Sequence, residues 1–205
     1  MKKMLMLCFI LVSGSANATT IGYADVVLDF FDSGAGPIAG PYGGEFPGGI
    51  GFPVAVSTDV VLGSDDGSNV DFLSLPTGSY VTVGFIDELV FDGLGNDIFV
   101  QEVGGNGERA NVYVSSDDIN YSLLGIAVDN ALTSFDLASI GFTDFVTSVK
   151  IVGLDNGGGS PGFDVVNVQA LPQSFTPNPV PEPMTLALFG IGLAGLGIYR
   201  KKKAR

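Results

Sequence analysis

The chain has 205 residues, no histidine, no tryptophan, one cysteine and a formal net charge of −13. The lack of histidine excludes Ser-His-Asp and Cys-His nucleophile systems and histidine-containing zinc sites. The acidic composition excludes nucleic acid as an expected partner, because phosphate binding needs clustered Lys and Arg.

The charges are distributed unevenly along the chain. All 22 acidic residues lie between Asp25 and Glu182, where Arg109 and Lys150 are the only bases, so this stretch carries a net −20. The other seven bases lie close to the two ends, beside apolar runs. Basic and apolar terminal segments are typical of targeting signals, and they are set aside before the fold is considered.

The first 18 residues have the features of a secretory signal peptide. Lys2 and Lys3 provide the positive start, residues 4–12 the apolar run, and Ala16 and Ala18 the small residues of a cleavage site. The apolar run of nine residues is too short to span a bilayer. We therefore predict a cleaved signal peptide at residues 1–18, whose removal also removes Cys8.

Residues 19–171 consist of short runs rich in Val, Ile, Phe and Tyr, separated by glycine-rich turns. Val81 and Val83 alternate with less apolar residues in one run, and Val149 and Ile151 do so in another, which is typical of strands with one buried face. The pattern predicts an all-β domain at residues 19–171, an antiparallel β-sandwich of the jelly-roll type. The expected strands are Ala24–Phe30, Val54–Leu62, Asn69–Leu75, Ser79–Phe85, Leu89–Phe91, Ile98–Val103, Ala110–Ser115, Tyr121–Gly125, Phe135–Leu137, Val146–Val152 and Phe163–Ala170.

Two acidic, glycine-rich loops offer oxygen ligands for Ca²⁺. Asp92, Asn96 and Asp97 fall in the first loop, and Asp155 and Asp164 flank the second. Ca²⁺ takes six to eight oxygens from such side chains and carbonyls. Asp, Asn and Gly also shape turns without any metal, and the spacing matches no EF-hand loop. Both hypotheses stay open here: turns alone, or a Ca²⁺ ion bound at these residues.

The acidic residues form no specific catalytic pattern. An Asp-Ser-Gly sequence begins at Asp32, but aspartic-protease chemistry needs two such loops facing each other, and the chain has one. Glu88 and Glu102 could be nominated as a glycosidase pair. With so many acids, however, some pair will always lie at a suitable distance. We therefore expect no enzyme and assign no catalytic residue.

The composition changes after Leu171. Five prolines between Pro172 and Pro183 predict an extended linker at residues 172–180. Residues 184–199 then contain no charge and are followed by a cluster of Arg and Lys. As a helix this segment would be about 24 Å long, close to the about 30 Å of a hydrocarbon core. We predict a transmembrane helix at residues 184–199, with its basic end cytoplasmic and the acidic body facing the periplasm.

Pro181, Glu182 and Pro183, the apolar segment and the basic cluster follow one another in the order of a known signal. Residues 181–205 resemble the PEP-CTERM sorting signal of exopolysaccharide-producing Gram-negative bacteria. The resemblance implies recognition by an exosortase-type transpeptidase, processing near the Pro-Glu-Pro sequence, and delivery to the cell surface or extracellular matrix. The tripeptide would then be a substrate site.

The body carries a second and less specific resemblance. Residues 32–44, 93–102, 112–115 and 162–166 look like parts of discoidin-like or galactose-binding-like β-sandwiches. That resemblance implies carbohydrate binding or a structural calcium. Together the two resemblances imply a non-enzymatic exported protein with a structural or adhesive role linked to exopolysaccharide. The alternative is a carbohydrate-binding or carbohydrate-active module. Candidate sugar-contacting residues are Tyr42, Tyr80, Tyr113 and Tyr121.

Overall fold

A computed structural model of the chain describes residues 22–48, 51–65, 69–129 and 132–178. In these residues all regular structure is strand except for two short 3₁₀ helices, which confirms the all-β prediction. No helix among them is long and apolar enough to cross a membrane. The strands are β1 (Val26–Phe31), β2 (Tyr42–Phe46), β3 (Val54–Ala55), β4 (Val70–Leu75), β5 (Tyr80–Gly84), β6 (Glu88–Val90), β7 (Ile98–Glu102), β8 (Arg109–Ser115), β9 (Ser122–Val128), β10 (Leu132–Phe135), β11 (Ser148–Gly153), β12 (Phe163–Ala170) and β13 (Phe175–Pro177). The 3₁₀ helices are η1 (Thr58–Val61) and η2 (Leu137–Ile140).

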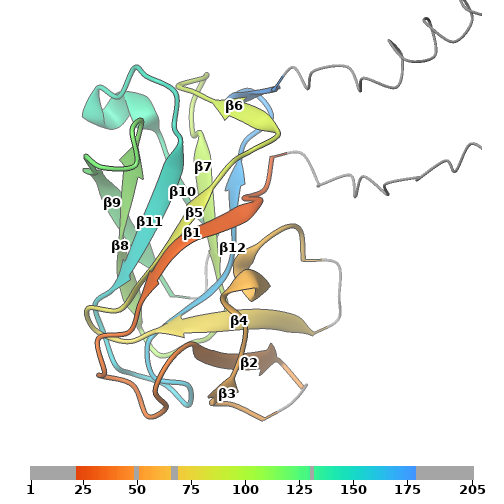
Figure 1. Ribbon diagram of the computed structural model, residues 1–205, viewed down its shortest axis with the longest axis vertical. Helices are drawn as coiled ribbons and strands as arrows, with labels where there is room; N and C mark the ends of the chain where they lie inside the picture. The colour runs from red at the N-terminus through yellow and green to blue at the C-terminus, as the bar shows by residue number, and fades with distance from the viewer. Residues whose placement is uncertain (1–21, 49–50, 66–68, 130–131, 179–205) are drawn as a thin grey trace, which may run out of the picture.

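The strands form two large antiparallel sheets and one small one (Figure 1). One large sheet has the order β1-β5-β11-β8-β9, and the other has the order β10-β7-β12-β4-β2-β3. Eight strands, β4, β5 and β7 to β12, account for most of both sheets. Their orders, β4-β12-β7-β10 and β5-β11-β8-β9, are those of two interlocking Greek keys, which is the topology of a jelly roll.

The core lies between the two large sheets, where the strand alternation places branched side chains. Antiparallel register aligns these side chains in rows across the five-stranded sheet. One row is Val81, Ile151 and Val112, and the next is Val83, Val149 and Val114; all six are fully buried. Leu73, Leu75, Ile98 and Val100 belong to the same core from the facing sheet. The predicted alternation in these strands is therefore confirmed.

The structure differs from the predicted strands in several places. Only the first two residues of the segment 54–62 form a strand, because Ser57 accepts a hydrogen bond from the amide of Asp59 and begins η1 there. The strand expected at residues 135–137 lies earlier, as β10, since Asp136 caps η2. Strand β2 was not predicted, because its central Gly43 and Gly44 resemble a turn in the sequence.

Residues 172–178, which the sequence assigns to an extended linker, pack against the sandwich. Strand β13 pairs with β6, and the buried hydroxyl of Ser174 donates to Asp97 at 2.6 Å. The amide of Asn178 donates to the carbonyl of Asp87, and the amide of Gly22 donates to the carboxylate of Glu88. The first and last described residues therefore both contact β6 or the residue preceding it.

The predicted targeting elements lie outside the described residues. These are the signal peptide at residues 1–18, the transmembrane helix at 184–199 and the Pro-Glu-Pro sequence at 181–183. They stay predictions as far as structure is concerned.

Candidate functional site

Three carboxylates from separate parts of the chain meet at one end of the sandwich. Glu102 is the last residue of β7, Glu108 precedes β8, and Asp164 is the second residue of β12. One oxygen of each lies within 4.8 Å of the others. Their relative exposures are 6%, 1% and 7%, so the group is buried. Hereafter we call these three residues the carboxylate trio.

Hydrogen bonding within the trio is uneven. The hydroxyl of Ser74 donates to Asp164 at 2.5 Å and lies 2.7 Å from the hydroxyl of Ser160. Neither oxygen of Glu108 has a hydrogen-bond partner among the described residues, although both atoms are buried. A buried polar atom without a partner is costly, so the Glu108 carboxylate needs a proton or a bound group to balance its charge.

The electrostatics of the trio follow from burial. Burial raises the pKa of Asp164 to about 9, with the charges of Glu108 and Glu102 acting in the same direction and the Ser74 hydroxyl against it. Burial also raises the pKa of Glu108 to about 7, with further contributions from Glu102, Asp129 and Asp155. Near neutral pH, in the absence of a cation, the trio therefore retains protons that carboxyl groups in water have lost.

Two glycines let the backbone approach the trio closely. A Cβ on Gly158 would lie 2.5 Å from an oxygen of Glu108, and a Cβ on Gly104 would lie 2.7 Å from an oxygen of Glu102. Gly158 also has φ +81°, a conformation that other residues rarely adopt. The glycine-rich loops at residues 103–107 and 157–159 are thus fitted around the carboxylates.

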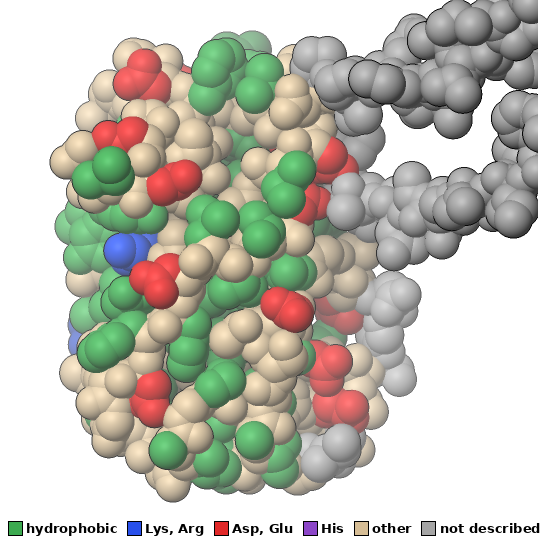
Figure 2. Space-filling view, in the orientation of Figure 1, with side chains coloured by type: hydrophobic (Ala, Val, Ile, Leu, Met, Phe, Trp, Pro, Cys, Tyr) green, Lys and Arg blue, Asp and Glu red, His purple; other side chains and the backbone are tan. Residues whose placement is uncertain are grey.

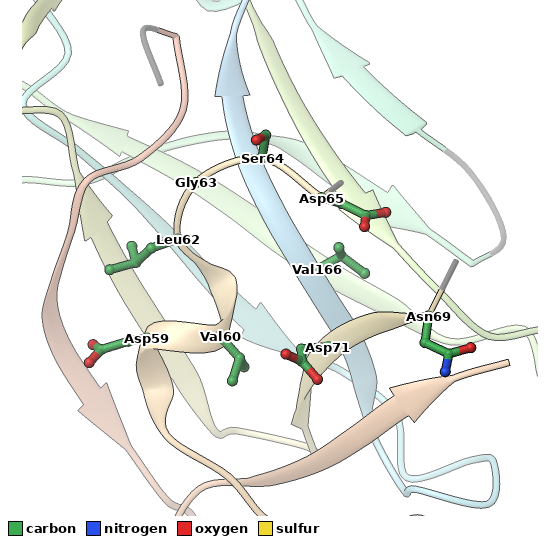
Figure 3. A pocket seen from close by; sticks show the side chains of 9 residues that line it. All are labelled: Asp59, Val60, Leu62, Gly63, Ser64, Asp65, Asn69, Asp71 and Val166. Atoms are coloured by element: carbon green, nitrogen blue, oxygen red, sulfur yellow. The ribbon is translucent and has the colours of Figure 1, made fainter. Parts of the chain in front are cut away.

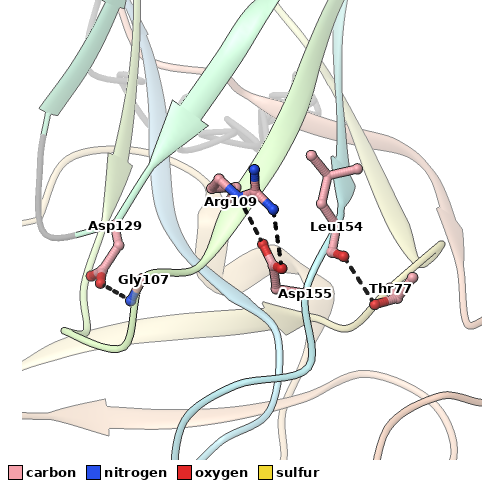
Figure 4. A network of polar contacts seen from close by, with 6 residues as sticks. All are labelled: Thr77, Gly107, Arg109, Asp129, Leu154 and Asp155. Carbon is pink, nitrogen blue, oxygen red and sulfur yellow. Dashed lines mark hydrogen bonds and ion pairs between the residues drawn. The ribbon is translucent and has the colours of Figure 1, made fainter.

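A set of polar contacts holds these loops in place (Figure 4). The amide of Gly107 donates to Asp129, which fixes the loop before Glu108 against the end of β9. Arg109 donates to both oxygens of Asp155, at 3.3 and 3.4 Å. This ion pair joins β8 to the loop that follows β11. Polar contacts therefore hold both of the loops that adjoin the trio.

A pocket of about 260 Å³ adjoins the trio through Asp164. Its polar wall includes Ser160 and Asn106. Its lining also includes Phe46, Phe52 and Phe72, the last two in edge-to-face contact.

The structure separates Asp155 from Asp164 but brings Asp92 and Asp97 of the other predicted calcium loop together. Asp164 belongs to the trio, whereas Asp155 lies on the surface with Arg109. Asp92 and Asp97 come together in a second cluster with Asp136, while the Asn96 amide donates to the hydroxyl of Ser134. Calcium binding at these residues stays a prediction.

Much of the Asp97 carboxylate is occupied by protein donors. One oxygen accepts from the amide of Gly93 and the hydroxyl of Ser174, and the other accepts from the amide of Leu137. Asp97 thus joins the loop before β7 to η2 and to the segment before β13. These bonds suit the turn-forming interpretation of this loop.

A third cluster consists of Asp25, Asp87 and Glu88 beside β6. Burial, together with Asp87 and Asp25, raises the pKa of Glu88 to about 8. Glu88 and Glu102, the nominal glycosidase pair, therefore belong to different clusters.

Sequence reasoning missed Glu108 and Asp136. The run Gly104-Gly105-Asn106-Gly107 before Glu108 was the available signal for the first, but its partners come from other strands.

A separate polar pocket of about 240 Å³ lies between η1 and β4 (Figure 3). Asp65, Asn69 and Asp71 line its rim, and Val166 lies at its floor. Asp65 and Asn69 flank residues 66–68 in the sequence, and the structure does not describe those three residues.

The candidate tyrosines divide between the two sheets. Tyr42 is buried in the six-stranded sheet, and its hydroxyl donates to the carbonyl of Pro161. Tyr80 and Tyr121 are on the outer face of the five-stranded sheet, with the Lys150 ammonium 4.7 and 3.9 Å from their ring centres. Phe31 stacks on Tyr80 at 5.5 Å between centroids, and Tyr113 is the register neighbour of Lys150 on β8.

Comparison with protein families yields one match, to the PEP-CTERM protein-sorting motif over residues 179–202. The chain carries a PEP-CTERM sorting motif. No curated protein and no solved structure matches the chain, so nothing further supports the resemblance of the body to discoidin-like modules. A PEP-CTERM motif implies an exported protein that an exosortase processes and that is associated with the membrane or cell surface.

The PEP-CTERM motif begins directly after the folded body. It starts at residue 179, whereas Asn178 still donates a hydrogen bond to the carbonyl of Asp87. The Pro181-Glu182-Pro183 sequence is within the matched range and outside the described residues. The last described residue therefore still contacts the sandwich, and the motif begins at the next residue.

Proposed function

We propose that this chain is a non-enzymatic, exported β-sandwich protein with a structural or adhesive role in an exopolysaccharide-containing matrix. An exosortase-type transpeptidase processes it near Pro181-Glu182-Pro183 and releases it to the cell surface or extracellular matrix, after residues 184–199 have held it in the membrane with the body facing the periplasm. The observation that carries the proposal is the PEP-CTERM motif at residues 179–202. Residues 1–18 supply the export signal that such a route needs.

One feature of the body supports a structural role. Acidic side chains are spread over the face drawn in Figure 2, where Lys and Arg occupy little surface. A strongly acidic body stays soluble and self-repelling in a crowded matrix.

Mass spectrometry of the protein recovered from the cell surface tests the sorting proposal. We expect a C-terminus near Pro181-Glu182-Pro183 and no peptide that contains Arg205. Glu182→Ala should leave the unprocessed chain in the membrane fraction, whereas Asp144→Ala, an exposed change in the body, should be processed normally. Surface protein that ends at Arg205 would contradict the proposal.

The alternative, a carbohydrate-binding module, is favoured by one observation. Phe31, Tyr80 and Tyr121 form an aromatic strip with Lys150 across β1, β5 and β11 and beside β9. Aromatic planes with a few polar groups are typical of ligand-binding surfaces. A neutral polysaccharide fits best, because the stretch from Asp25 to Glu182, with a net charge of −20, repels polyanions.

A glycan array probed with the full chain tests this alternative. Binding to a neutral polysaccharide should fall at least about tenfold in Tyr121→Ala, by the loss of a central aromatic contact. Phe145→Ala, an exposed aromatic outside the strip, should bind as the wild type does. Equal binding by both variants would exclude this face as the sugar-binding surface.

A further inference from the structure

We propose that Glu102, Glu108 and Asp164 bind one Ca²⁺ ion. The site is independent of the sorting signal, and of the residues predicted for calcium from the sequence it includes only Asp164. Each ligand comes from a different part of the chain: the end of β7, the loop before β8 and the start of β12. A bound ion would therefore link the connection between β7 and β8 to β12, which lies far from it in the sequence.

The first observation that supports a bound cation is the burial and charge of the trio. All three carboxylates are less than 10% exposed, and their ligand oxygens converge within 4.8 Å. The Arg109–Asp155 ion pair lies outside the trio on the surface. Buried charges are normally paired or coordinate metals, and three converging carboxylates have the charge that a cation would neutralise.

The unpartnered Glu108 side chain is the second and independent observation. Its exposure is 1%, and neither of its oxygens has a hydrogen-bond partner among the described residues. By contrast, the buried Asp97 carboxylate accepts three hydrogen bonds from the protein. Glu108 thus offers an unpartnered acceptor oxygen to the cluster, which a metal ion would satisfy.

The donor set selects calcium. The three groups offer carboxylate oxygens alone, which are the ligands of hard cations. Zinc sites usually use His or Cys, but the chain has no histidine and its single cysteine is Cys8. Mg²⁺ requires near-ideal octahedral geometry and retains several waters, whereas Ca²⁺ accepts irregular sets that include bidentate carboxylates. Gly104 and Gly158 keep the adjacent backbone close to the carboxylates.

Calorimetric titration of the full chain with CaCl₂, and thermal unfolding in EDTA or CaCl₂, test the proposal. We expect saturable Ca²⁺ binding and a higher midpoint of unfolding in CaCl₂. Glu108→Gln should weaken Ca²⁺ binding at least about tenfold and abolish the midpoint shift. The same variant should not lower the midpoint in EDTA, because it removes a buried charge. Asp144→Asn, which removes an exposed charge, should keep the full response to Ca²⁺.

Several results would contradict calcium binding by the trio. The proposal fails if the wild type shows no binding and no shift in CaCl₂, or if it responds to MgCl₂ as strongly as to CaCl₂. It also fails if Glu108→Gln responds as the wild type does. Should Glu108→Gln not fold, Glu102→Gln replaces it, and an unchanged response of that variant overturns the proposal.

Discussion

Replacing Gly153 by alanine is expected to destabilise the domain by about 3 kcal/mol or more, because the new methyl group would strike backbone. A Cβ at this position would lie 1.9 Å from the carbonyl oxygen of Leu75. Neither chain can yield easily: the side chain of Leu75 is fully buried in the core, and Gly153 exchanges hydrogen bonds with Gly78 and Ser79.

The same contact fixes the loop beside the carboxylate trio. A Cβ on Gly162 would lie 2.4 Å from the carbonyl carbon of Leu75, so Gly153 and Gly162 both pack on the Leu75–Pro76 peptide. These glycines bracket the loop at residues 154–161, which includes Gly158 beside Glu108. Crowding at Gly153 should therefore disturb the site as well as the core.

Thermal unfolding measures this effect with a matched control. A loss of 3 kcal/mol lowers the midpoint by about 6 to 12 °C in a domain of this size. Gly105→Ala should change stability by less than about 0.5 kcal/mol, because no atom lies within 4 Å of the new Cβ. Equal midpoints for the two variants would show that the backbone at Leu75 can move freely.

Most strands could be predicted from the sequence because their physical signal is local. Successive side chains of a strand point to opposite faces of the sheet, so apolar residues at every second position predict one buried face. Val81 in β5 and Ile151 in β11 follow this pattern and are buried. Strand β2 could not be predicted in this way. A Cβ on Gly43 would lie 1.8 Å from the Phe72 carbonyl oxygen, so close packing requires the residue type that the sequence associates with turns.

The candidate site depends on contacts that the sequence does not display. Asp164 was a predicted ligand because glycine and acidic residues precede it. Glu102 and Glu108 lie 62 and 56 residues away along the chain, and only the pairing of β12 with β7 brings them close. Strand β13 was missed for the same reason, because its partner β6 is distant from it in the sequence.

The metal-free protein is expected to be most stable near pH 4 to 5 and to lose more than about 3 kcal/mol of stability between pH 5 and pH 9. Burial raises the pKa of Asp164 to about 9, from an ordinary value of 3.8. Burial likewise raises the pKa of Glu88 to about 8 and that of Glu108 to about 7, from 4.5. Between each ordinary value and the raised one, the folded protein holds more protons than the unfolded chain.

The sign of the effect follows from this difference in bound protons. The stability that these three groups contribute is fully present at pH values below their ordinary pKa values near 4. It decreases as pH rises toward their raised pKa values between about 7 and 9. Each pKa unit is worth about 1.4 kcal/mol, so the five-unit shift of Asp164 alone can exceed the predicted loss. Below pH 4 the sign reverses, because backbone hydrogen bonds lower the pKa of Asp117 and Asp32.

Unfolding in EDTA across pH 3 to 9 measures the dependence, and two substitutions assign it. Asp164→Asn should reduce the decline above pH 5, because the amide carries no charge at any of these pH values, whereas Asp144→Asn should leave the decline unchanged. A flat or rising stability between pH 5 and pH 9 in the wild type would contradict the raised pKa values.

Saturating Ca²⁺ should reduce the same decline in stability, since a cation that binds the ionised trio favours the folded state most at pH values where the carboxyl groups have lost their protons. Protons and Ca²⁺ therefore compete for the same buried oxygens, and the slope of stability against pH distinguishes which of them the trio holds.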